Sequence, residues 1–457
     1  MNETKKNFTI GVLPQPKIGS CSRRFAGSFI ESPDLCPIAK QVLSECGGLP
    51  IAISTVGRAL QYKSKEIWKN ALRQLRKATP DHISGLKIDV YGKIELSYDC
   101  LESEEAKSCL LLCCLYNKSS YIPIEDLIRH MLGLGLFKDI ESVADGRNSV
   151  IASIDILKSC FLLMDSKKEG CVEMHEVVRD VALSIASKSE NTIVASHGVK
   201  LKDWPKSGVH RQFYTSTVMT SSGIDNRRDG TKPKLLLVSC TDASSIPPNT
   251  ILDGMEKLKV LEMRRANLES ILPSLPCLKH LQTLCLEHCI LQDVSVIGEL
   301  QTLLILSLRN SDIKELPSKI GYLSNLRLLD LARCDNLLKI SPGVISSFGK
   351  LEELYMGGTS VRWMAWEQGK WVANMILLEL LSIRHLTTLE IGLLVLIPEI
   401  IQENITFFNN LERFKISIGS QYAFWDVTSC ENHLRLQHNS DDVWSEICDL
   451  GLRKLQS

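Results

Sequence analysis

Five side chains able to bind a metal lie close together in the sequence. They are Cys277, His280, Cys285, His288 and Cys289. Thiolate and imidazole are ligands that Zn²⁺ prefers, but the group contains no C-x-x-C pair. Because alternate side chains of a strand point to opposite faces, Cys285 points away from its neighbours Leu284 and Leu286, whereas Cys289 shares their side. We therefore predict no metal site here.

The chain lacks the sequence motifs of common catalytic sites. There is no G-x-x-x-x-G-K-[ST] loop, whose backbone N–H groups and lysine cradle nucleotide phosphates. The G-x-S-x-G, H-E-x-x-H and protein-kinase signatures are also missing. We therefore predict no catalytic residues and no autonomous ATPase activity.

A leucine-rich frame, L-x-x-L-x-L-x-x-C/N-x-L, recurs through residues 258–361. It is complete at Leu281, Leu284, Leu286, Cys289 and Leu291. The five clear copies start at residues 258, 281, 303, 326 and 351, so the periods are 23, 22, 23 and 25 residues. A repeat of this length cannot bury its apolar side alone, so neighbouring repeats must stack into a solenoid. Weaker frames begin at Leu235, Leu386 and Leu411.

The segments that connect the frames contain prolines, which favour irregular or 3₁₀ structure over long α-helices. They are Pro273, Pro276, Pro317 and Pro342.

Strand alternation within each frame predicts which side chains leave the repeat interior. Leu284 and Leu286 point inward, and the intervening positions face the concave side of the solenoid. In the central repeats these outward positions are Cys285, Glu287, Ser307, Arg309, Asp330, Ala332, Glu353 and Tyr355. Mixed charges with one aromatic suit a protein surface better than a polyanion. We predict that Glu287, Arg309, Asp330, Glu353 and Tyr355 bind a protein partner; alternatively, the strip packs against helical domains of the same chain.

The N-terminal part is predicted to be helical after an irregular leader over residues 1–34. Apolar residues recur at helical spacing from residue 37 to Cys46, after Pro50, and over 67–75, 88–98 and 103–116. Ser103 is the expected N-cap of the last of these helices. Residues 35–116 are therefore expected to form a helical bundle.

A winged-helix module is predicted over residues 117–190. Two amphipathic helices precede residues 161–165 and 171–174, which alternate like the strands of a hairpin around Gly170. Residues 121–160 contain six acidic and four basic residues, whereas a domain that binds double-stranded DNA needs an excess of basic residues. We therefore predict no nucleic-acid binding. Residues 191–232 form a connector and 233–457 the solenoid. The expected fold class is α+β multidomain, with a helical bundle and winged-helix module followed by an α/β leucine-rich-repeat solenoid.

The composition indicates a folded, cytoplasmic, multidomain protein. The chain has 457 residues, 44% of them hydrophobic, and its 53 basic and 53 acidic residues cancel. No overall field therefore attracts nucleic acid or an anionic membrane. The longest apolar runs are far shorter than the roughly 20 residues that span a bilayer, and the N-terminus lacks a signal-peptide core. The 16 scattered cysteines indicate reduced thiols.

Three segments resemble plant NB-ARC leucine-rich-repeat disease-resistance proteins of the coiled-coil class. Residues 46–52, CGGLPIA, are similar to that family's G-L-P-L-A motif. Residues 109–137 are similar to its C-F-L-Y-C-x-L-F-P…L-I…W-x-x-x-G-L stretch, with a methionine in place of the tryptophan. Residues 174–182, MHEVVRDVA, match its M-H-D-x-x-R-D-x-A segment except for Glu176. With the repeats, the resemblance covers roughly residues 25–457.

The resemblance implies an intracellular immune receptor in which repeats hold a nucleotide-dependent switch inactive or sense a pathogen effector or a guarded host protein. It implies ADP or ATP as cofactor, bound through the motif Gly48, Leu49 and Pro50, with Pro50 on the adenine and His175 on a phosphate. The structural alternatives are a helix start for Pro50 and a cap or core position for His175.

In that family the coiled coil, the P-loop and the acidic metal-binding strand lie upstream of the G-L-P-L motif. We therefore expect a truncated member, with residues 1–34 containing a remnant of the nucleotide-binding domain and with nucleotide binding weak or absent. Two other functions are compatible with the sequence: an interaction scaffold without nucleotide binding, and a switch completed by another chain.

Overall fold

The computed structural model describes residues 32–46, 50–77, 86–116, 120–188, 193–199, 217–218, 234–240, 246–247, 252–362, 364–367, 370–373, 375–393, 403–418 and 433–436. Most of the predicted leader, together with Gly48 and Leu49, lies outside these residues. The chain divides into two compact units. The first consists of Met1–Leu127 with Asn148–Lys188, and the second of Ile128–Arg147 with Ser189–Ser457.

Helices dominate the first unit. They include α2 (Cys36–Glu45), α3 (Pro50–Ala59), α4 (Lys65–Lys77), α5 (Leu86–Asp99) and α6 (Glu104–Cys113). The apolar stripes of the first four helices meet in one core, in which Trp68 and Ile53 are fully buried. Ser103 caps α6, as predicted, because its hydroxyl oxygen accepts a hydrogen bond from the Ala106 N–H at 3.0 Å.

A small antiparallel sheet follows in the same unit. Its strands are β1 (Ile122–Pro123), β2 (Met164–Asp165) and β3 (Cys171–Glu173), in the order β1-β3-β2, and helix α9 (Glu176–Lys188) comes after β3. The predicted hairpin is present, with Gly170 at a φ of 67° in its loop. Its first strand is shorter than predicted, because Phe161 has a φ of 57°, which ends helical geometry without starting a strand. The winged-helix assignment stays a prediction.

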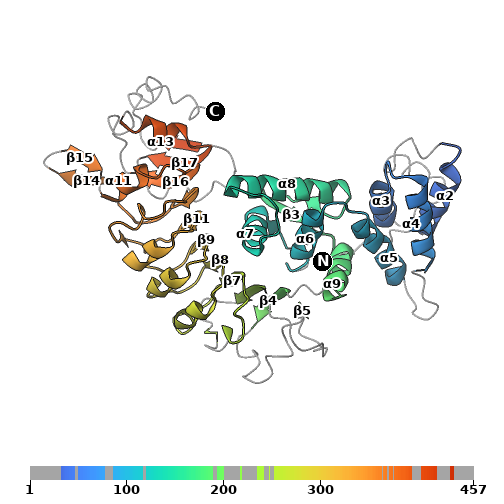
Figure 1. Cartoon of the computed structure of the whole chain (residues 1–457), viewed down its shortest axis with the longest axis horizontal. Helices are drawn as coiled ribbons and strands as arrows, with labels where there is room; N and C mark the ends of the chain where they lie inside the picture. Colours follow the sequence, from blue (N-terminus) through green and yellow to red (C-terminus); the bar gives the residue numbers. More distant parts are fainter. Residues whose placement is uncertain are drawn as a thin grey trace, which may run out of the picture. The chain divides into compact units, whose positions relative to one another are not determined.

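A parallel sheet of leucine-rich repeats forms most of the second unit (Figure 1). Its central strands are β6 (Leu235–Cys240), β7 (Val260–Arg264), β8 (Thr283–Glu287), β9 (Ile305–Ser307), β11 (Leu328–Asp330), β13 (Glu353–Tyr355), β16 (Thr388–Leu393) and β17 (Arg413–Ile418). Leu284, Leu306 and Leu329 are cross-strand neighbours in register, so the sequence frame is the register of the sheet. The weaker frames supply β6, β16 and β17.

Strands also extend this sheet at both edges. They are β4 (Ile193–Val199) and β5 (Thr217–Val218) at one edge and β18 (His433–Leu436) at the other. Strand β4 pairs with β6 in parallel, although residues 191–232 read as a connector in the sequence. Its sequence, IVASHGV, carries no leucine frame, so the repeat pattern could not reveal it.

The segments that return from one strand to the next are 3₁₀-helices in the central repeats. They are η4 (Leu272–Cys277), η5 (Ser295–Glu299) and η6 (Ser318–Tyr322). Of the prolines noted in the sequence, Pro273 and Pro276 lie in η4, and Pro317 lies directly before η6. Later repeats use short α-helices, α11 (Met375–Leu381) and α13 (Ile405–Asn409). Two short sheets lie beside the main one: β10 (Glu315–Leu316) with β12 (Lys339–Ile340), and β14 (Met364–Glu367) with β15 (Lys370–Ala373). Frame leucines from all these repeats share one continuous core.

Each repeat turns out of its strand through a residue with positive φ at the same frame position. These residues are Arg265, His288, Asn310, Arg333 and Gly358, with φ between 55° and 75°. Only glycine adopts this left-handed conformation without a steric cost, and four of the five positions carry a side chain. The turn geometry therefore follows from the repeat rather than from the local residue.

Candidate functional site on the outer face of the sheet

The second unit contains more than repeats, because Ile128–Arg147 belongs to it. This stretch, here called the docked segment, comprises the end of α7 (Ile124–Leu134), a loop and the start of α8 (Val143–Ser159). It covers the face of the sheet opposite the leucine core. This face, here called the outer face, is the one that strand alternation predicted to form the concave side of the solenoid. As a result Asp330 and Glu353, which alternation turns outward, are 0% and 1% exposed.

Four carboxylates form the centre of this covered face. We call Glu262, Glu287, Asp330 and Glu353 the acidic strip. They come from β7, β8, β11 and β13, and all four are buried. An isolated buried carboxylate is strongly unfavourable, so each needs a cation or several hydrogen bonds.

Arg129 of α7 bridges two members of the acidic strip. Its Nη1 donates to Glu287 Oε1 at 2.7 Å and to the Ser307 hydroxyl at 3.2 Å, and its Nη2 donates to Asp330 Oδ2 at 2.6 Å. Burial raises the pKa of Asp330, but Arg309 and Arg129 lower it by more, so this pKa lies below its usual value. The carboxylate is therefore ionised, and Arg129 lies above β9 with an anion on each side.

His130, the next residue, contacts the acidic strip at Glu262. Its Nε2 lies 2.7 Å from Glu262 Oε2 and must carry the proton of this hydrogen bond, because an ionised carboxylate only accepts. Burial raises the pKa of Glu262, but Arg264 and His130 lower it below its usual value. Arg264 ties neighbouring repeats together, since it forms ion pairs with Glu262 at 2.9 Å and Glu287 at 3.2 Å.

Arg147 of α8 completes the set at Glu353. Its Nη2 donates to both carboxylate oxygens, at 3.0 and 2.8 Å. The Tyr355 hydroxyl donates to the same carboxylate at 2.7 Å, and Arg413 lies 3.6 Å away as a further ion-pair partner. Two arginines from the docked segment are thus each held by carboxylates of the repeats.

Backbone contacts fix the docked segment as well. The Thr283 hydroxyl donates to the Arg129 carbonyl at 3.1 Å, and Lys259 Nζ donates to the Leu134 carbonyl at 3.2 Å. Lys259 therefore places a positive charge at the C-terminal end of α7, which complements the helix dipole. Where α8 begins, the Val143 N–H donates to Glu352 Oε2 at 2.6 Å.

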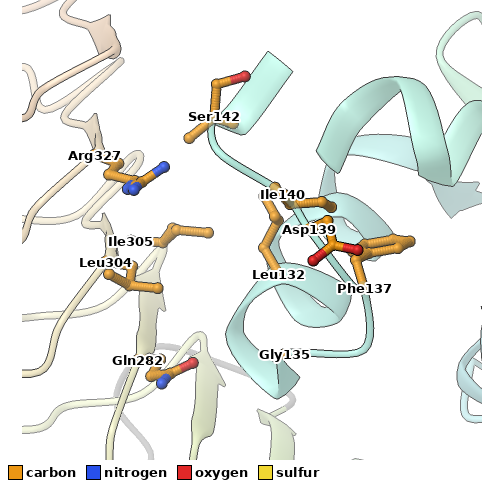
Figure 2. Close-up of a pocket in the computed structure, with 11 residues that line it drawn as sticks. Leu132, Gly135, Phe137, Asp139, Ile140, Ser142, Gln282, Leu304, Ile305 and Arg327 are labelled. Carbon is orange, nitrogen blue, oxygen red and sulfur yellow. The ribbon is translucent and has the colours of Figure 1, made fainter. Parts of the chain in front are cut away.

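Apolar contacts lie beside the charged ones. Val143 of the docked segment packs with Ile305 and Leu328, which occupy the outward position nearest the start of β9 and β11. Next to them is a cavity of about 340 Å³. Figure 2 shows it between Leu132 and Ile140 on one side and the repeat residues, including Leu304 and Ile305, on the other. The docked segment therefore fits the sheet through its charges more closely than through its apolar side chains.

The predicted partner-binding residues gather on this face. Glu287, Asp330 and Glu353 belong to the acidic strip, Tyr355 orients Glu353, and Arg309 Nη1 donates to Asp330 Oδ2 at 3.2 Å. Asp330 raises the pKa of Arg309 above its already high usual value, so Arg309 keeps its charge. Whether an outside partner binds these residues stays a prediction.

Sequence reasoning missed the other half of the site. The sequence patterns did not single out Arg129, His130, Gly133 or Arg147, and Glu262 was not among the predicted residues. A usable signal was the apolar stripe of α7, because Ile128 and Met131 face inward and leave Arg129 and His130 to contact something else.

The residues implied to bind nucleotide are placed as follows. Gly48 and Leu49 lie outside the described residues, and Pro50 begins α3. His175 is exposed directly before α9, and its Nδ1 accepts a hydrogen bond from the Val177 N–H at 3.2 Å. In this structure His175 therefore acts as a cap of α9.

The cysteines and histidines that suggested zinc occupy different environments. Cys285 lies on the outer sheet face, in register with Glu262 and Ser307. Cys289 lies in the leucine core, where its thiol donates to the Met263 carbonyl at 3.4 Å, and burial raises its pKa to about 12. Within the described ranges, no three His, Cys, Asp or Glu side chains come together in a metal-binding group.

The helices that the structure describes include none with both the length and the apolar character needed to cross a membrane.

The fold and the site define a leucine-rich-repeat protein whose outer sheet face holds a helical segment of its own chain. No family model matches the chain. It is 29% identical to disease resistance protein At4g27190 of Arabidopsis thaliana over 412 residues, 87% of this chain and 41% of the relative. It is also 27% identical to disease resistance protein RFL1 of that plant over 338 residues, 72% of this chain and 38% of the relative.

A third relative, disease resistance protein RPS5 of Arabidopsis thaliana, is 31% identical over 179 residues, 38% of this chain and 20% of the relative. The chain is thus similar to several plant disease-resistance proteins, and it spans about two fifths or less of the length of these relatives.

Two solved structures show some likeness to this chain. Internalin C2 of Listeria monocytogenes is 16% identical with a TM-score of 0.27, covering 44% of this chain and 71% of that chain. The LRR ectodomain of the receptor kinase GASSHO1/SCHENGEN3 from Arabidopsis thaliana is 19% identical with a TM-score of 0.23, covering 47% of this chain and 29% of that chain. Because these TM-scores are low, the leucine-rich-repeat fold is assigned from the register of the parallel strands in this chain and not from these likenesses.

Proposed function

We propose that this chain acts as a cytoplasmic immune receptor of the disease-resistance type, in which the acidic strip holds the docked segment until a pathogen effector or a guarded host protein is recognised. One observation carries the proposal. Arg129 and Arg147, 5% and 8% exposed, are bound by carboxylates from repeats on the outer sheet face.

The physical character of this contact suits a switch better than a permanent core. Replacing a buried ion pair with well-packed apolar residues is often neutral or stabilising, so ion pairs are a poor way to gain stability alone. Removing one partner, however, strands a buried charge and costs about 3–5 kcal/mol. If the docked segment leaves the sheet as one body, its arginines and the carboxylates of the acidic strip become exposed to water together, and no buried charge is left unpaired. We therefore expect the docked segment to be released as a whole or to stay bound.

The test is tryptic cleavage after Lys138, which lies in the exposed loop of the docked segment. The double variant Arg129→Glu/Arg147→Glu brings two new carboxylates against the four carboxylates of the acidic strip. We expect cleavage at least about tenfold faster than in the natural chain, which corresponds to a change of roughly 1.4 kcal/mol in the free energy of releasing the docked segment. Arg76→Glu is the matched control, because it removes an exposed ion pair with Glu45. Unchanged cleavage in the double variant rejects the proposal and favours a plain interaction scaffold.

For the cofactor, we propose that ADP and ATP bind weakly or not at all. The elements that support a contact are the start of α3 at Pro50 and the exposed imidazole of His175, and one nitrogen of that imidazole already caps α9. If nucleotide does bind, Arg or backbone donors elsewhere must hold the phosphates. Calorimetric titration with ADP should give no heat beyond dilution; a signal abolished by His175→Ala would overturn this expectation.

We propose further that the chain is not an enzyme. Phosphoryl transfer needs a phosphate cradle and acidic metal ligands, and the sequence shows no Walker loop. Purified protein should not release phosphate from ATP above the buffer blank.

A further inference from the structure

We infer that the partner which replaces the docked segment on the acidic strip is a protein helix carrying two arginines on one face, about two turns apart. The inference rests on the proposed release of the docked segment and names the chemistry of what binds afterwards. It starts from the chain's own segment, which shows what the strip accepts.

Charge determines the class of partner. The acidic strip contributes four buried carboxylates to the outer sheet face, and the docked segment supplies Arg129 and Arg147 as cations. A partner that covers the strip without cations would bury its four carboxylates with only Arg264, Arg309 and Arg413 of the repeats as ion-pair partners, which is unfavourable. The same carboxylates repel nucleic acid and anionic lipid. Guanidinium suits the strip better than ammonium, because the planar fork donates to two acceptors at once, as Arg129 and Arg147 both do.

Sheet geometry determines the spacing. Arg129 lies above β9, between Glu287 and Asp330, whereas Arg147 binds Glu353 on β13. Two strand spacings of about 4.8 Å separate β9 from β13, and Glu353 lies two residues before Tyr355, the register partner of Asp330. The two guanidinium sites are therefore roughly 12 Å apart.

A single helix can match this distance. Residues i and i+7 lie on the same face and about 10.5 Å apart along the axis, and flexible arginine stems cover the difference. An apolar residue between them would face Ile305 and Leu328, the positions that Val143 occupies now. The inferred partner is therefore an amphipathic helix with arginines at i and i+7 and a leucine near i+4.

The experiment uses the full chain with the strip intact and the docked segment loosened in two independent ways. Gly133→Leu forces α7 away from β8 without changing any charge, and Arg129→Gln/Arg147→Gln removes the native cations. The probe is a fluorescein-labelled, alanine-rich helix of about 20 residues with arginines at i and i+7. Its control has the second arginine at i+5, about 140° around the helix. Fluorescence anisotropy gives the affinities, and cleavage after Lys138 reports whether the docked segment has left.

We expect both loosened variants to bind the i, i+7 probe at least tenfold more tightly than the natural chain binds it. Each loosened variant should also bind this probe at least tenfold more tightly than it binds the i+5 control. Adding Glu287→Gln/Asp330→Asn should abolish the difference between probes. Equal binding of the two probes, while Lys138 is readily cleaved, overturns the inference and leaves the proposed function standing. Protection of Lys138 in both variants overturns the proposed function, and the inference with it.

Discussion

Gly133 of α7 lies against Thr283 of β8 so closely that a Cβ added to the glycine would come within 2.2 Å of the threonine hydroxyl oxygen. The same Cβ would lie 2.8 Å from a methyl carbon of Val260. The Thr283 hydroxyl is also the donor that binds the Arg129 carbonyl. The absence of a side chain at Gly133 thus sets the height of α7 above the sheet, and with it the reach of Arg129 into the acidic strip.

Gly133→Ala should therefore loosen the docked segment. Overpacking of this kind costs about 1–3 kcal/mol, and it should appear as faster amide hydrogen exchange in residues 128–134 and faster cleavage after Lys138. Gly349→Ala is the control, because a Cβ there meets nothing within 4 Å. If the two alanine variants exchange at equal rates, the close approach of α7 to β8 does not hold the segment.

Arg147 and Glu353 allow a charge-swap test of the second anchor. Arg147→Glu and Glu353→Arg should each lower the free energy of unfolding of the second unit by about 3–5 kcal/mol, because each replaces a buried ion pair with two like charges. The double swap restores opposite charges and should recover part of the loss, with a coupling of about 1–3 kcal/mol in a urea-unfolding cycle. Strictly additive losses would mean that the two side chains do not interact in solution.

The repeat frame predicted much of this unit because it specifies a register directly. Once Leu284 and Leu306 are placed in equivalent frames, they must be cross-strand neighbours, and the outward direction of Glu287 and Asp330 follows from alternation. The pairing of Arg129 with Asp330 has no such local code, since 201 residues separate them. Alternation says that a side chain leaves the core but not what covers it.

Other features escaped prediction for related reasons. Strand β4 lacks the leucine frame and is recognisable only through its pairing with β6. The role of Gly133 depends on how near a helix comes to a sheet, which helical periodicity does not encode. The N-cap at Ser103 was predictable, because a cap and the N–H that it binds lie three residues apart.

The positive-φ positions that close each strand give a prediction about stability. Gly358, with a φ of 75°, should resist substitution: Gly358→Ala should cost about 1 kcal/mol through backbone strain. Arg265, at the equivalent position with a φ of 56°, should behave in the opposite way, and Arg265→Gly should gain about 0.5 kcal/mol once the entropy of glycine is subtracted. Urea midpoints measure both. A stabilising Gly358→Ala would show that the turns are not left-handed.

Acid should release the docked segment, and the direction follows from Asp330. Burial raises the pKa of this carboxyl, but Arg309 and Arg129 lower it by more, so in the folded state it lies below the usual value of 3.8. A group with a lowered folded pKa contributes stability that is present above its unfolded pKa and is lost as pH falls through the folded pKa. Unfolding stability should therefore be nearly constant from pH 7 to about 5 and should decline below about 4.

Asp330→Asn isolates this contribution. The amide cannot be ionised, so the variant should be less stable at neutral pH and should lose less stability between about pH 5 and 3 than the natural chain. Glu315→Gln is the control: its exposed ion pair with Lys339 also lowers the pKa of Glu315, but water already screens it, so its urea midpoints should follow those of the natural chain. If Asp330→Asn and the natural chain lose stability in parallel as pH falls, the charge on Asp330 does not hold Arg129 in place.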